Sequence, residues 1–175
     1  NLPPGDWQAG ERGLAALPDR KADFRKSVET ALRYAAATGV ARVHVMSGIA
    51  SRDDVQACAC YRDSVAYLCD QAGQAELDVL IEPINARDMP GYFLNDFNYA
   101  ADLIADLGAA NLKLQFDIYH RQIMRGDVLK TKRRIDGRVE QVGREPQFVR
   151  RLVAVRRDDA ERVVEQQVPA AIGHR

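Results

Sequence analysis

The sequence predicts an α/β fold built on parallel strands, and three observations lead to this prediction. Short apolar segments alternate with longer segments in which apolar residues recur every three to four positions, as they do in helices. The short segments recur at intervals of about 35 residues, which is typical of strand–helix–strand units with parallel strands. Two of these segments end in an acid, Glu82 and Asp117. Because ligands bind at the carboxyl ends of parallel strands, these two acids indicate a shared site.

Each predicted element follows from local signals. The predicted helices cover residues 21–38, 52–72 and 96–107, with a short fourth helix from about residue 119. The predicted strands cover residues 41–46, 77–82 and 112–117. Gly39 is placed to end the first helix, and a Pro- and Gly-containing loop over 85–95 precedes the third. Three strands are fewer than a complete eight-stranded barrel needs, so the chain is either a small open sheet or a piece of a barrel.

The composition is that of an ordinary soluble globular protein. Of the 175 residues, 46% are hydrophobic and 29% are charged, with a formal net charge of zero. This balance gives no electrostatic reason to expect nucleic acid or an anionic membrane as a partner. No apolar run reaches the roughly 20 residues of a membrane span, and no signal peptide opens the chain. The three cysteines, Cys58, Cys60 and Cys69, fall in one predicted helix as small, reduced apolar residues, so we expect a cytoplasmic protein.

The first candidate site block surrounds Glu82. Pro83 removes a backbone donor directly after the acid, so strand pairing ends there and Glu82 faces the mouth of the sheet. Asn85 and Asp88 follow in the loop and can face the same cavity. The alternative is a strand-end acid that only caps a helix or pairs with an arginine.

The second candidate block holds Asp117 and His120. If a helix begins just after Asp117, His120 lies one turn along it on the same side. The two residues can then share a divalent cation, or Asp117 can hold the cation while His120 contacts a substrate oxygen. The alternative is a histidine bonded to a local carbonyl. His44, in the middle of the first strand, is interpreted as a core histidine in preference to a site residue.

Several segments together carry a family resemblance. They are NLPPGDWQAGERGLAALP (1–18), VHVMSG (43–48), LIEPINARDMPGYFLN (80–95) and NLKLQFDIYHRQIMRGD (111–127). In order and spacing, residues 1–130 closely resemble the hydroxypyruvate isomerases of the xylose isomerase-like TIM-barrel superfamily. The resemblance implies a partial (β/α)8 TIM barrel that holds the fourth to sixth strands.

The resemblance also implies residue roles. Glu82 and Asp117 would bind a divalent metal ion, Mg²⁺ or Mn²⁺, and Glu82 would be one of two proton-shuttling carboxylates. His120, Asp88 and Asn85 would bind the substrate, a small 2-oxo or hydroxy acid. The implied reaction interconverts hydroxypyruvate and tartronate semialdehyde through a metal-stabilised enediolate.

Other functions stay open beside this one. The loop over 87–95 would set the substrate length, so a 2-oxotetronate isomerase of the same family is an alternative. A metal-dependent endonuclease on the same barrel is less favoured, since the sequence shows no basic groove for phosphates. The oligomeric state is also open, and a homo-oligomer is one alternative.

The composition changes after residue 130. Arginine and valine become abundant, lysine is absent after Lys132, and the strand–helix alternation is lost. We therefore expect a partial barrel over 1–130 and a divergent tail over 131–175, either mainly helical, with a helix over 148–168, or disordered. The Gln and second Glu that complete the family's site have no counterpart here. A lone copy should then bind metal weakly, and a non-catalytic product is the third alternative.

Overall fold

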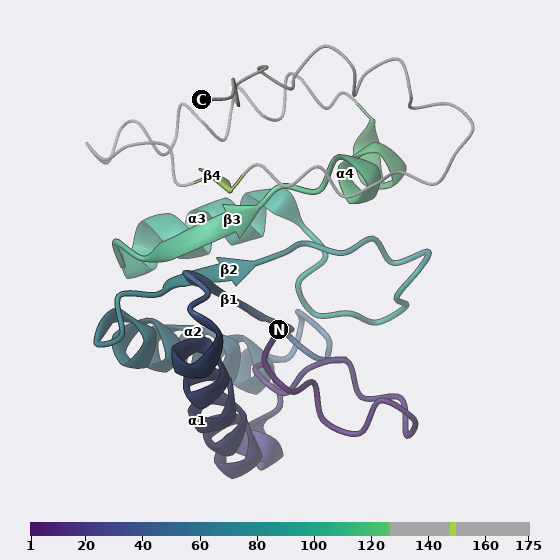
Figure 1. The fold of residues 1–175 in the computed structure, drawn as a ribbon. Coiled ribbons are helices and arrows are strands. Elements are labelled where there is room, and N and C mark those ends of the chain that lie inside the picture. The colour runs from purple at the N-terminus through teal and green to yellow at the C-terminus, as the bar shows by residue number, and fades with distance from the viewer. Residues whose placement is uncertain (127–147, 150–175) are drawn as a thin grey trace, which may run out of the picture.

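The three predicted strands form a parallel sheet in the computed structural model, which describes residues 1–126 and the backbone of residues 148 and 149. The sheet consists of β1 (Arg42–Val45), β2 (Asp78–Ile81), β3 (Leu112–Gln115) and β4 (Phe148–Val149), in that spatial order. All neighbouring strands pair in parallel (Figure 1). The sequence order therefore equals the order in space, as it does in a barrel.

The fourth strand differs from the expectation for the tail. Residues 148 and 149 would begin the helix that was one of the two alternatives for the tail, but they pair with Leu114 and Gln115 of β3. The outer edge of β3 offers unpaired backbone groups, and Phe and Val are favoured in strands. The rest of the expected helix and the boundary at residue 130 lie outside the described residues.

The predicted helices are all present. They are α1 (Lys21–Thr38), α2 (Val55–Gly73), α3 (Phe97–Leu107) and α4 (Ile118–Arg125), with a short 3-10 helix, η1 (Pro18–Arg20), before the first. The predicted bounds of α1 are confirmed, and Gly39 ends it in a left-handed conformation. The second helix begins three residues later than predicted because Asp54 caps it, accepting a hydrogen bond from the backbone of Gln56.

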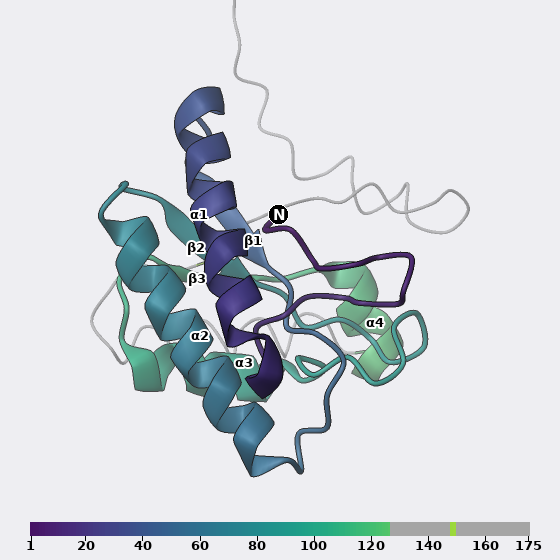
Figure 2. The ribbon, with the colours of Figure 1, turned by 90° about the horizontal axis from the view of Figure 1, so that it is seen from below.

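The two faces of the sheet differ in composition. Figure 2 shows α1 and α2 lying across one side of the strands. That side, the helix face, is apolar and belongs to one core with the helices: Val43, Val45, Val79, Ile81, Leu112 and Leu114. Register and alternation put another set on the opposite side, the polar face, which we define as His44, Leu80, Lys113 and Gln115 with the strand-end acids Glu82 and Asp117.

Hydrogen bonds and close packing hold the loops at the carboxyl end of the sheet. Ser47, just after β1, donates its N–H to the Tyr92 hydroxyl at 2.9 Å and accepts the N–H of Leu94 at 3.1 Å. Gly13 packs so tightly on the end of β1 that an added Cβ would lie 2.2 Å from the Met46 carbonyl oxygen. Its φ of +110° also disfavours any other residue. The Ser47 contacts fix the loop that follows β2 and carries candidate site residues.

Two further expectations concern the described residues. Cys58, Cys60 and Cys69 all lie in α2 and are free thiols, as expected. Among the helices formed by residues 1–126, none combines the length and apolar character that crossing a bilayer requires.

Candidate metal and substrate site

Glu82 lies directly after β2 on the polar face, as predicted. Its side chain is buried, and its Oε2 lies 3.6 Å from Nε2 of His44 on the neighbouring strand. His44 pairs in register with Leu80, two residues before Glu82, so the two side chains share a face. His44 is buried, as a core histidine would be, but it also adjoins the site. The sequence did not favour a place for His44 beside the site, because alternation alone does not show which strands are neighbours.

Asp117 joins β3 to α4. It caps the helix, with Oδ1 accepting the backbone N–H of Tyr119 at 2.7 Å and, more weakly, that of His120 at 3.4 Å. The helix therefore begins just after the acid, as expected from the sequence. The cap fixes the direction of the carboxylate and brings the first turn of α4 over the site.

The two acids and the imidazole converge. One candidate ligand atom from each of Glu82, Asp117 and His120 lies within 4.8 Å of the other two. Both acids are buried and His120 is half-buried. Two carboxylates that close together in a buried place are costly unless a proton or a cation neutralises them. Oxygen-rich donors of this kind fit a hard divalent cation.

Asn85 and Asp88 form a second group beside this cluster. Asn85 is buried, and its Nδ2 lies 3.0 Å from Asp88 Oδ2 and 2.7 Å from His120 Nδ1. The Asn85 hydrogen bond lowers the pKa of the Asp88 carboxyl, with a smaller contribution from Tyr119. Asp88 itself is exposed. The structure thus brings Asn85 into direct contact with the cluster, while Asp88 lies outside it and contacts Asn85.

Burial governs the charge of His120. It lowers the pKa of the imidazole, while the carboxylates of Asp117 and Asp88 act in the opposite direction. The lowered pKa favours a neutral ring. A neutral imidazole can accept a hydrogen bond at one nitrogen and donate at the other.

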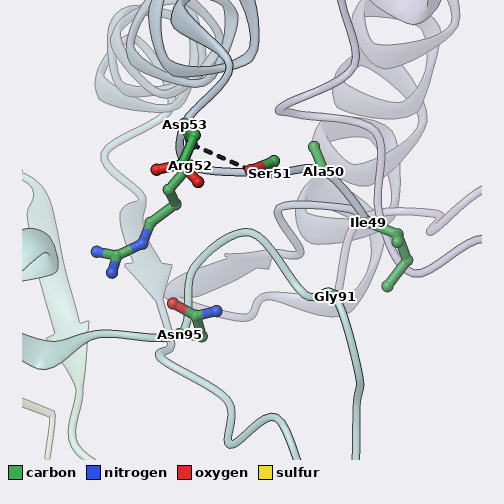
Figure 3. Close-up of a pocket in the computed structure, with 7 residues that line it drawn as sticks. All are labelled: Ile49, Ala50, Ser51, Arg52, Asp53, Gly91 and Asn95. Atoms are coloured by element: carbon green, nitrogen blue, oxygen red, sulfur yellow. Dashed lines mark hydrogen bonds between the residues drawn. The ribbon is translucent and has the colours of Figure 1, made fainter.

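A separate open pocket of about 500 Å³ lies between the loops that follow β1 and β2 (Figure 3). Arg52 reaches from the first loop toward the second, which carries Asn95. The Ala50 N–H donates to the Gly91 carbonyl at 3.1 Å and ties the two loops together. None of the five predicted site residues lines this pocket, so it is distinct from the Glu82–Asp117–His120 cluster.

Comparisons with known proteins agree with this architecture. A family model described as xylose isomerase-like TIM barrel matches residues 1–173. A 2-oxo-tetronate isomerase of Cupriavidus necator is 52% identical over 78% of this chain and 54% of its own length. A hydroxypyruvate isomerase of Escherichia coli is 41% identical over 75% of this chain and 52% of its own length. The chain spans about half the length of these curated relatives.

A solved structure shares the fold. The crystal structure of an AP endonuclease, family 2, from Brucella melitensis superposes with a TM-score of 0.74 at 33% identity. The match covers 85% of this chain and 69% of that one.

Proposed function

The chain belongs to the xylose isomerase-like TIM barrel family, and we propose that it carries metal- and substrate-binding residues of an isomerase acting on a small 2-oxo acid. The observation that carries the proposal is the convergence of Glu82, Asp117 and His120 from the ends of two successive strands. Relatives named as isomerases over the same residues support it.

The proposed roles follow from the side chains. Glu82 and Asp117 would hold a divalent ion, Mg²⁺ or Mn²⁺, which when bound polarises a substrate carbonyl and stabilises negative charge on the substrate oxygens. Glu82, a buried carboxylate, would also take the proton from the carbon beside the carbonyl and help return it to the adjacent carbon. His120 would donate a hydrogen bond to a substrate oxygen, and Asn85 and Asp88 would support His120 on the substrate side of the site.

Two substrates of the same chemical class are candidates. Hydroxypyruvate, interconverted with tartronate semialdehyde, is the first, and the Escherichia coli relative carries that activity in its name. A 2-oxo-tetronate is the second, and the higher identity of the Cupriavidus necator relative favours it. The loop over 87–95 would set the substrate length. The endonuclease name of the Brucella melitensis protein raises DNA as a substrate, and the net charge of zero stands against it.

The proposal is tested with the purified 175-residue chain in D2O with Mg²⁺ or Mn²⁺. Each substrate is followed by proton NMR, because exchange of the hydrogen beside the carbonyl reports proton removal even where net turnover is slow. We expect metal-dependent exchange that Glu82→Gln abolishes and Asp78→Asn, at the other end of β2, retains. Exchange with the tetronate alone would favour the second substrate. An absence of both exchange and metal binding in the wild type would overturn the proposal in favour of a non-catalytic chain.

A further inference from the structure

Asn85 is among the most buried polar residues of the described chain, at 1% exposure. Its Oδ1 accepts the backbone N–H of Asp88 at 2.9 Å, and its Nδ2 donates to the Asp88 carboxylate at 3.0 Å. A backbone N–H can only donate, and an ionised carboxylate can only accept. The orientation of the Asn85 amide is therefore fixed by Asp88.

This orientation determines what His120 meets. The Asn85 Nδ2, which carries a second hydrogen, lies 2.7 Å from His120 Nδ1. The backbone N–H of Asn85 points to the same nitrogen from 3.5 Å. Two donors face Nδ1, so this nitrogen must present its lone pair. In a neutral imidazole the proton then resides on Nε2.

We propose that Asn85 is a positioning residue that holds His120 in the Nε2–H tautomer, so that the imidazole donates a hydrogen bond to a substrate oxygen and does not ligate the metal. The substrate half of this statement rests on the function proposed above. Coordination through Nε2 would place a proton on Nδ1, against the two Asn85 donors. Coordination through Nδ1 would displace the Asn85 amide. Both routes to metal ligation are therefore disfavoured, although the ring lies within reach of the two acids.

Asn85 then has a role other than the substrate contact expected for it. To donate a hydrogen bond to the substrate, Asn85 would need a free amide hydrogen. Both hydrogens are engaged, one by Asp88 and one by His120. Asn85 thus acts through His120, and Asp88 acts through Asn85.

The test is the imidazole nitrogen spectrum of ¹⁵N-labelled chain without metal or substrate, at a pH where the ring is neutral. His120→Gln assigns the His120 signals. We expect the wild type to show the Nε2–H tautomer alone. Asn85→Asp, which turns an acceptor toward Nδ1, should shift His120 largely to the Nδ1–H tautomer, and Asn85→Ala should yield a mixture. Asn95→Asp adds the same charge to the same loop and should leave the His120 tautomer unchanged.

Two results would overturn the inference. One is an Nδ1–H tautomer in the wild type, read once His120→Gln has assigned the signals and without any change at Asn85. The other is a His120 spectrum that stays the same in both Asn85 variants while unchanged His44 signals show an intact sheet. The nitrogen spectrum requires neither turnover nor metal. An inactive chain would therefore contradict the proposed function without deciding the tautomer of His120.

Discussion

The helix face and the polar face of the sheet are built from the same strands and are buried to a similar extent, but they differ in chemistry. The helix-face residues are all aliphatic and 0–6% exposed. On the polar face His44, Glu82, Gln115 and Asp117 are 7–9% exposed. Burial of polar groups opposes folding unless they find partners, whereas aliphatic burial drives it. The helix face therefore explains why the chain folds, and the polar face indicates what the fold is used for.

The largest effect should come from the helix face. Ile81→Ala removes a fully buried side chain from the core and should lower the free energy of unfolding by about 2–5 kcal/mol. Leu80→Ala, one residue earlier, changes the polar face and lies outside that core, so its cost should be smaller. Urea unfolding followed by circular dichroism measures both. Equal costs for the two variants would mean that the faces do not differ in their contribution to stability.

Some parts of the fold could be predicted from the sequence because a local residue determines them, and others could not. The bounds of α1 were predictable because Gly39 ends the helix through its own conformation, with its N–H bonded to the Ala35 carbonyl. The start of α2 was missed by three residues, since Ser51 also offers a capping side chain and the sequence does not show that Asp54 is the residue that starts the helix. β4 was missed because a two-residue strand depends on pairing with β3, which is distant in sequence.

The candidate site was predictable to the extent that it depends on strand ends. Glu82 and Asp117 each follow a strand, and parallel strands bring their carboxyl ends together whatever the register. His44 depends on register, because only its pairing with Leu80 shows that it faces Glu82. The link from Asp88 through Asn85 to His120 depends on loop conformation, which carries no periodic signal in the sequence.

The second largest effect should be on metal affinity at the polar face. Glu82→Gln keeps the shape of the side chain and removes its charge, so we expect Mn²⁺ affinity to fall by at least about tenfold, since even outer-sphere changes cost that much. Isothermal titration calorimetry of the purified chain measures the change. Asp78→Asn removes an acid from the other end of the same strand and is the matched control. Equal Mn²⁺ affinities for the wild type and Glu82→Gln would show that Glu82 does not bind the metal.

A third, smaller effect should separate the two roles of Asp117. Asp117→Ala loses the cap of α4, so in the metal-free chain its free energy of unfolding should lie about 1 kcal/mol below that of Asp117→Asn. Asp117→Asn keeps a capping oxygen, and it removes the same buried charge, so the difference between the two variants isolates the cap. Thermal unfolding in the presence of a chelator measures it. Should Asp117→Asn be as destabilising as Asp117→Ala, the carboxylate would contribute to stability through something other than the cap.

The smallest effect should be at the amino end of β2, away from the site. Asp78 lies 3.8 Å from the Arg42 guanidinium and 3.9 Å from the Lys113 ammonium, in half-exposed ion pairs. Pairs of this kind contribute about 0–1 kcal/mol, so Asp78→Asn should change the free energy of unfolding by no more than that. Urea unfolding at low and high salt measures it, because screening should shrink the difference further. A larger loss that salt does not reduce would contradict this prediction. It would show that Asp78, an acid away from the site, also makes a substantial contribution to stability.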